Sequence, residues 1–329
     1  MRINILGAAA SLALLVGCSG VGTMPNSPTA APAGRVSSGM ARVMTLRHFA
    51  SFYSCPATGR LVYISDYNNN LINVYAGKLE RQAPCGRLTA KVQSPWGLFV
   101  KPSTHDLYVA NDGAQDILVF HRGQTQSYNT YTDPTQQDPV GVTVAPDGTV
   151  IASNLIQINF NENGSISTWI GGPNGGTFVG NFATANGGYA QYVTALRNGV
   201  IYFDDLLGQT NITLFFRLSC PAGACGAQTQ IAGASLNGPG GLAADDAGDV
   251  LASNPIGFAE TFEMPNPTPS TFPIAGSPLA MAIDEFSNHW YVTNAVNNDA
   301  EEYYYPSGKL VGTVPGTAGD ALEGIAVDP

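Results

Sequence analysis

Histidine has the broadest catalytic and metal-binding chemistry near neutral pH, and this sequence contains only four. They are His48, His105, His121 and His289. No pair has the His-Glu-x-x-His spacing that binds zinc on a helix, and no Gly-x-Ser-x-Gly turn presents an activated serine. His105 and His289 each stand next to the start of a β-rich run, so we expect both to lie in exposed turns. The sequence offers no assembled catalytic set.

Five cysteines form the second group of reactive residues, and the first lies close to the N-terminus. Cys18 follows a single basic residue and an apolar run, 3–16, that is too short to span a membrane and is typical of a secretory signal. Leu15-Val-Gly-Cys18 resembles the bacterial lipobox, which implies a signal peptide over 1–17 and a lipidated Cys18. The alternative is an ordinary signal peptide in which Cys18 has no role. Ser19, rather than Asp, after Cys18 favours the outer membrane if the host has two membranes.

The other four cysteines are even in number, as expected for an exported protein in an oxidising compartment. They are Cys55, Cys85, Cys220 and Cys225. Four cysteines allow three connectivities, and proximity in sequence favours Cys55–Cys85 and Cys220–Cys225. A metal site is the alternative, but no His stands near either pair and the spacings differ from those of zinc ligands.

Side chains able to bind a ligand recur at the ends of β-rich runs, since six runs end in Asn or Asp every 40 to 50 residues. The runs are Leu61–Asp66, Leu107–Asn111, Val150–Asn154, Val200–Asp204, Val250–Asn254 and Trp290–Asn294. This period is that of the four-stranded blades of a β-propeller. A residue that returns in every repeat is explained most simply as a turn cap that bonds the backbone.

The elements that position these residues can be read from the same repeat. Most repeats begin with Pro, any residue, a small residue and an aliphatic residue, at Pro95, Pro139, Pro239 and Pro278. The small residue would let an innermost strand approach the crowded axis. Ala190-Gln-Tyr-Val193 replaces this start in the fourth repeat, which is the most irregular.

The end of the chain predicts how the ring closes. The first repeat has only a poor inner-strand candidate, near Phe52-Tyr53, whereas Leu322–Asp328 reads as an inner strand with nothing after it. We therefore predict an all-β, six-bladed propeller of four-stranded antiparallel blades over 46–329, closed by the C-terminal strand. A truncated seventh blade is the alternative. Residues 18–45, rich in Ser, Gly, Pro and Ala, are predicted to be a flexible linker that follows the lipidated cysteine.

Tyr108-Val-Ala-Asn111 and Tyr291-Val-Thr-Asn294, with the Pro-x-Gly-Leu starts and Asp-Gly turns, resemble the NHL and YVTN groups of β-propellers. The resemblance covers about 50–329 and implies the fold, but these groups contain enzymes and binding platforms alike. A propeller of the senescence-marker/gluconolactonase type would hold a divalent ion, such as Ca²⁺, with a Glu, an Asn and an Asp. Glu323, Asn154 and Asp204 imitate that set, so a metal-dependent hydrolase or lactonase remains the alternative function.

Departures from the repeat are the best candidates for a binding site. Residues between the Pro and the small residue would surround one mouth of the central channel, and they are Trp96, Val140, Gly240, Leu279 and Glu323. We select Trp96 and Glu323 from this set, together with Asp205 in the irregular repeat. The aromatic-acidic run Glu301–Tyr305 either packs in the sheet or stacks on sugars or peptides.

Charge and composition limit the classes of possible binding partner. The net charge of −10, without any cluster of Lys or Arg, argues against nucleic acid. The leading hypothesis is therefore a non-enzymatic binding or scaffolding module, held to a membrane by its lipid and facing a protein or glycan of the bacterial envelope.

Overall fold

Antiparallel strands joined by tight turns make up almost all of the computed structural model. It describes residues 49–329 except 136, 158–163, 208–211, 239, 246, 263–268, 285–287 and 318. The predicted signal peptide 1–17, Cys18, the linker 18–45, residues 46–48 with His48, and Pro239 lie outside the described residues. No helix in the described part is long and apolar enough to cross a membrane.

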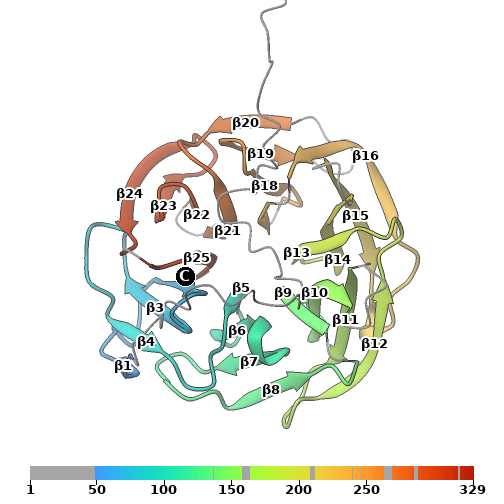
Figure 1. Cartoon of the computed structure of the whole chain (residues 1–329), viewed down its shortest axis with the longest axis horizontal. Helices are drawn as coiled ribbons and strands as arrows, with labels where there is room; N and C mark the ends of the chain where they lie inside the picture. Colours follow the sequence, from blue (N-terminus) through green and yellow to red (C-terminus); the bar gives the residue numbers. More distant parts are fainter. Residues whose placement is uncertain are drawn as a thin grey trace, which may run out of the picture. The chain divides into compact units, whose positions relative to one another are not determined.

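The strands form six antiparallel sheets, the blades of a ring (Figure 1). From the inside outward, blade one contains β25 (Leu322–Asp328), β2 (Leu61–Asp66), β3 (Leu71–Ala76), β4 (Gly86–Leu88) and β1 (Phe52–Tyr53). Blade two contains β5 (Pro95–Lys101), β6 (Asp106–Asn111), β7 (Asp116–Phe120) and β8 (Asn129–Thr132). Blade three contains β9 (Gln137–Val144), β10 (Thr149–Gln157), β11 (Ser165–Ile170) and β12 (Thr177–Ala183).

The other three blades repeat this order. Blade four contains β13 (Tyr189–Ala195), β14 (Val200–Leu206), β15 (Ile212–Ser219) and β16 (Thr229–Asn237). Blade five contains β17 (Leu242–Ala244), β18 (Val250–Asn254), β19 (Phe258–Phe262) and β20 (Pro269–Pro273). Blade six contains β21 (Pro278–Asp284), β22 (His289–Asn294), β23 (Asp299–Tyr304) and β24 (Lys309–Pro315). Two short 3₁₀ turns, η1 (Asp112–Ala114) and η2 (Pro221–Gly223), complete the described elements.

The ring closes through the C-terminal strand, as predicted. β25 pairs antiparallel with β2, and each of the six inner strands contacts the next around the axis (Figure 1). Phe52-Tyr53 does not supply an inner strand; as β1 it pairs with β4 on the outside of blade one. Blade one therefore has five strands, and a truncated seventh blade is excluded.

Small residues near the start of the inner strands let neighbouring blades approach. A Cβ atom added to Gly324 would lie 1.9 Å from the Trp96 carbonyl oxygen, and one on Gly97 would lie 2.6 Å from that of Val140. Both distances are far below van der Waals contact, so a larger residue would separate the blades. The repeated small residue is thus required by contact between blades, and the apolar core lies between the sheets.

In four of the six blades, a hydroxyl group one residue before the Asn or Asp of the repeat also joins neighbouring blades. The Ser65 hydroxyl donates to the carbonyl of Trp96 in the next blade at 2.8 Å. Ser153 donates in the same way to Gln191 at 2.9 Å, and Thr293 donates to Glu323 at 3.1 Å. Ser253 makes the equivalent bond to Leu279. A hydrogen bond repeated at several blade boundaries fixes their relative height.

Both predicted disulfides are present, since Cys55 bonds Cys85 and Cys220 bonds Cys225. Two other expectations need comment. His105 is exposed, as expected, but His289 is buried within β22, because its ring packs in the sheet against Glu302 and Arg60. The run Glu301–Tyr305 mainly packs: Glu301, Glu302 and Tyr303 are buried, and Tyr304 is 40% exposed.

Candidate functional site

The inner strands begin at one end of the channel, where Trp96 and Glu323 were predicted to surround a mouth. Trp96 is 4% exposed and Glu323 is 3% exposed. The Trp96 indole nitrogen in blade two donates to the Tyr192 hydroxyl in blade four, 3.3 Å away. The Tyr67 ring packs edge-on against Trp96, with 5.8 Å between the ring centroids. We call Tyr67, Trp96 and Tyr192 the plug, because Trp96 contacts both tyrosines where the inner strands begin.

Tyr192 belongs to the plug because blade four departs from the repeat. In the pairing of β13 with β14, Ala190 lies opposite Asp205 and Val193 lies opposite Phe203. Tyr192 therefore takes the position that Gly97 and Gly141 hold in blades two and three. A Cβ atom added to Gly141 would meet the Tyr192 Cα at 3.2 Å, which places the two residues side by side. An aromatic ring thus replaces a small residue at one of six equivalent positions.

Glu323 adjoins the plug without a cationic partner. Burial, together with the negative charge of Asp66, raises the pKa of its carboxyl to about 8. Within the described part of the chain, its Oε2 atom is buried and accepts no hydrogen bond. Burial likewise raises the pKa of Asp66 to about 6, although bonds from Asn69 and Ala321 oppose the shift. Glu323 is therefore a buried acid that favours its neutral form.

The two acids of blade four have different positions in the repeat. The register places Asp205, and not Asp204, at the Asn/Asp position, because Asp205 pairs with Ala190 as Asn111 pairs with Pro95. Asp204 stands where blades one, three, five and six carry the bridging hydroxyl. Its carboxylate accepts the Gln191 amide at 3.1 Å and the Tyr192 amide at 2.5 Å. The run predicted from the sequence, Val200–Asp204, therefore ended one residue before the Asn/Asp position of this blade.

Burial dominates the electrostatics of both acids. It raises the pKa of Asp204 to about 8, against the lowering effect of the backbone amides. Burial raises the pKa of Asp205 to about 6, while the amides of Gly188 and Asn186 lower it. Asp205 thus faces the backbone that enters its own blade, but within the described part of the chain neither of its buried carboxylate oxygens accepts a hydrogen bond.

The Asn residues of the repeat act mainly as caps. Asn111 accepts the Gln93 amide at 2.6 Å, and Asn294 accepts the Ser277 amide at 3.0 Å. Both bonds hold the segment that leads into the inner strand of the same blade. In blade three, Asn154 donates to the hydroxyls of Ser165 and Ser167. These bonds account for the Asn in these three blades.

The possible metal set Glu323, Asn154 and Asp204 is distributed over three blades. Asn154 makes its hydrogen bonds between β10 and β11, and Asp204 holds amides of β13. Glu323 and Asp204 each act on the pKa of Tyr192, so both lie near the plug. In the described residues, no group of three His, Cys, Asp or Glu side chains is placed to hold a metal ion.

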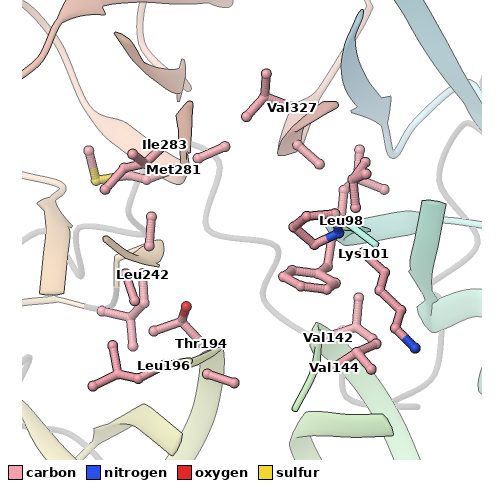
Figure 2. Close-up of a pocket in the computed structure, with 18 of the residues that line it drawn as sticks. Leu98, Lys101, Val142, Val144, Thr194, Leu196, Leu242, Met281, Ile283 and Val327 are labelled. Atoms are coloured by element: carbon pink, nitrogen blue, oxygen red, sulfur yellow. The ribbon is translucent and has the colours of Figure 1, made fainter. Parts of the chain in front are cut away.

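The opposite end of the channel, where the inner strands finish, contains a cavity of about 450 Å³. This volume falls within the roughly 300–1,000 Å³ of small-molecule sites. Aliphatic side chains from different blades, including Val142, Leu242, Met281 and Val327, line it (Figure 2). We call this cavity the funnel, because a smaller space of about 20 Å³ continues from the same strands to Tyr192 of the plug.

One repeated position forms the narrow part of the funnel. All six inner strands contribute the residue that follows the small position, and these six line both cavities: Leu98, Val142, Val193, Leu242, Met281 and Ile325. Each side chain is aliphatic, so the wall is apolar around the whole circumference.

Polar side chains lie towards the wide end of the funnel. Two of the acids there have partners within the fold. Asp245 accepts the Tyr305 hydroxyl at 2.7 Å and the amides of Gly248 and Asp249, and Asp284 lies 3.7 Å from Arg60. Lys101 and Arg197 are the basic lining residues, from blades two and four.

The predicted site and the cavity lie at opposite ends of the channel. The residues between the Pro and the small residue are largely buried, and the space lies beyond the aliphatic residue that follows. The signal was already present in the repeated Pro-x-small-aliphatic pattern, which has an aliphatic residue at that point in every blade. The pattern does not indicate at which end of the channel side chains fill the space.

Comparison with known proteins confirms the fold. No protein-family model matches the chain, and no curated protein sequence matches it. A solved structure of a nidogen/laminin complex contains a similar chain, with a TM-score of 0.61 and 15% identity over 82% of this chain and 99% of the other. A protein of unknown function from Desulfotomaculum acetoxidans gives 0.57 and 12%, with coverages of 82% and 99%. Hydrazine synthase from Kuenenia stuttgartiensis gives 0.56 and 14%, with coverages of 77% and 82%. At such identities the likeness extends to the propeller alone.

Proposed function

We propose that this protein is a non-enzymatic binding module of the cell envelope and that its funnel receives an apolar group of its partner. The observation that carries the proposal is the asymmetry of the channel. One end is filled by the plug, and the other opens into an apolar cavity of about 450 Å³. A cavity of this kind binds by burying apolar surface, at about 25 cal/mol per Å² removed from water.

The wall of the funnel also narrows the class of partner. A glycan needs several hydrogen-bonding groups to replace the water around its hydroxyls, since unpaired polar groups are costly to bury. Aliphatic side chains surround the narrow part of the funnel, and Thr194 is one of few polar residues farther along the wall. This lining favours an apolar ligand, or an apolar side chain of a protein partner, over a glycan.

The proposed location in the cell envelope rests on the N-terminal sequence and on the cysteines. Two disulfides suggest an extracellular or periplasmic compartment. The lipobox-like Leu15–Cys18 supports a protein cut before Cys18 and anchored by lipid to the envelope. The repeats support a place among the NHL and YVTN groups of propellers, and a similar chain in a nidogen/laminin complex is consistent with a role in binding.

A dye-binding experiment tests the function. We expect a neutral apolar dye, N-phenyl-1-naphthylamine, to bind with a rise in fluorescence. Ala244→Phe, which fills space in the funnel, should reduce this binding at least tenfold. Val296→Phe enlarges a side chain that is 58% exposed in the turn after β22, at the closed end, and is the matched control. Equal binding by both variants, each folded by circular dichroism, would show that the funnel does not bind the dye.

The anchor has its own test. Cys18→Ala removes the thiol that would carry the lipid, so we expect the protein to move from the membrane fraction to the soluble fraction. The Cys55→Ala/Cys85→Ala variant, which keeps Cys18, should stay with the membrane. Membrane association that survives Cys18→Ala would disprove lipid anchoring at this residue.

A further inference from the structure

Two tiers of apolar side chains line the funnel. The lower tier, which we call the collar, is the set of six residues that line both cavities: Leu98, Val142, Val193, Leu242, Met281 and Ile325. Two positions further along the same strands, the upper tier also lines the funnel, and each of its six residues is again apolar: Val100, Val144, Ala195, Ala244, Ile283 and Val327. Figure 2 shows members of both tiers on opposite sides of the space. A group that enters the funnel thus meets apolar side chains from every blade.

The floor below the collar departs from the repeat in a single residue. In five of the six inner strands, the residue before the collar is Gly or Ala, at Gly97, Gly141, Gly241, Ala280 and Gly324. In blade four it is Tyr192, whose ring lines the space of about 20 Å³ below the funnel. Tyr192 is 6% exposed, and its hydroxyl accepts the indole N–H of Trp96 at 3.3 Å. One aromatic side chain therefore stands at a level to which the other five blades contribute no large side chain.

This arrangement favours a slender apolar ligand. From Gly97 to Val100 the strand β5 rises by about 10 Å. A group that fills this depth must pass the six side chains of the collar before it meets Tyr192. It can carry no hydrogen-bonding group there, because no side chain of the collar could pair with it and burial of an unpaired polar group is costly.

We infer that the funnel takes an unbranched aliphatic chain end-on, and that Tyr192 limits the length of chain that it accepts. The inference rests on the proposed binding function and adds the class of ligand and the residue that sets the depth of the site.

A series of primary alcohols, from hexan-1-ol to dodecan-1-ol, tests the aliphatic chain. Each is titrated into the folded protein while N-phenyl-1-naphthylamine is displaced. Burial of one further methylene should tighten binding roughly fourfold until the chain reaches Tyr192, after which the affinity stops rising. The compact cage 1-adamantanemethanol, with as many carbons as undecan-1-ol, should bind more weakly than that alcohol. An affinity that does not depend on chain length, or tighter binding of the cage, would overturn the inference.

Two substitutions of Tyr192 test the limit. Tyr192→Gly restores the small residue of the other blades, so longer chains should enter. The first alcohol beyond the wild-type limit should then bind this variant roughly fourfold more tightly than it binds the wild type. Tyr192→Phe keeps the ring and is the matched control, which should retain the wild-type limit. If Tyr192→Gly is folded by circular dichroism and has the limit of the wild type, Tyr192 does not set the depth of the site.

Leu98→Phe decides the question if Tyr192→Gly does not fold. It enlarges a partly exposed residue of the collar, so the limit should move to shorter alcohols. An unchanged limit in this variant contradicts entry through the collar.

Two further outcomes separate this inference from the proposed function. If the dye binds and Ala244→Phe prevents it, but chain length has no effect, the funnel is a binding site and the class of ligand is wrong. If neither the dye nor any alcohol binds, the proposed function fails as well.

Discussion

Glu323 shows how a single buried acid connects the plug with the pH dependence of folding. Its carboxyl has an ordinary pKa of 4.5, and burial together with the charge of Asp66 raises the pKa to about 8 in the folded protein. Between these two values the folded state holds a proton that the unfolded state has lost. The stabilising contribution of this group is therefore complete below about pH 4.5 and is lost as the pH rises towards 8.

Glu323→Gln should remove this dependence, because the amide keeps the shape of the neutral acid and cannot ionise. Urea unfolding at pH 5, 6.5 and 8 would measure it. We expect the free energy of unfolding of the wild type to fall relative to the variant by roughly 1 kcal/mol per pH unit between pH 5 and 8. Glu80→Gln, an exposed substitution of the same kind, is the control. Parallel pH profiles for the wild type and Glu323→Gln would mean that this carboxyl does not titrate in that range.

Much about the individual residues could be predicted from the sequence. The repeat identified its Asn and Asp residues as caps, and the hydrogen bonds of Asn111 and Asn294 confirm this. Trp96 and Glu323 were correctly recognised as departures from the repeat. That Tyr192 would fill a glycine position and reach Trp96 could not be predicted, because the contact joins blades two and four and depends on the curvature of the ring.

The strands and turns were the most predictable elements, because alternation and turn residues are local properties. The exception was β1, which is two residues long and pairs outside β4. Nothing in Phe52-Tyr53 indicates an outer position, but Cys55 follows it and bonds Cys85, directly before β4. This disulfide holds the N-terminal segment against blade one, whereas Cys220–Cys225 closes only the turn between β15 and β16.

The two disulfides should therefore differ in their contribution to stability. The sequence separation is 30 residues for Cys55–Cys85 and 5 for Cys220–Cys225. Chain entropy in the unfolded state gives about 4 kcal/mol for the longer loop and about 2 kcal/mol for the shorter. Replacing each pair by alanines and measuring chemical denaturation would test the order. A larger loss for the Cys220/Cys225 pair would show that strain or residual structure, and not loop length, decides it.

In the whole molecule, the boundary between blades six and one is where the ring closes, and it contains more than the strand β25. Arg60, just before β2 of blade one, lies 3.0 Å from the Glu302 carboxylate on β23 of blade six. The same carboxylate accepts the Leu79 amide at 2.7 Å and is bonded by His289 and Tyr291. Closure by β25 was predictable from an unpaired strand at the end of the chain. This polar network was not, because Arg60 and Leu79 are separated from Glu302 by more than two hundred residues.

Glu302→Gln should weaken the closed ring more than any loss of a surface charge. Glu302 is fully buried, and Arg60 is 14% exposed, so the variant would take the nearer carboxylate from a largely buried guanidinium and leave it Asp284, 3.7 Å away. Breaking one side of such a pair costs about 3 kcal/mol or more. Glu80→Gln should change stability by less than about 0.5 kcal/mol. Hydrogen exchange would locate the effect: amides of β2, β23 and β25 should lose protection first, because the ring opens where its two ends meet. A loss of protection spread evenly over all six blades would show instead that the ring unfolds as one unit. The boundary between blades six and one would then be no weaker than the others.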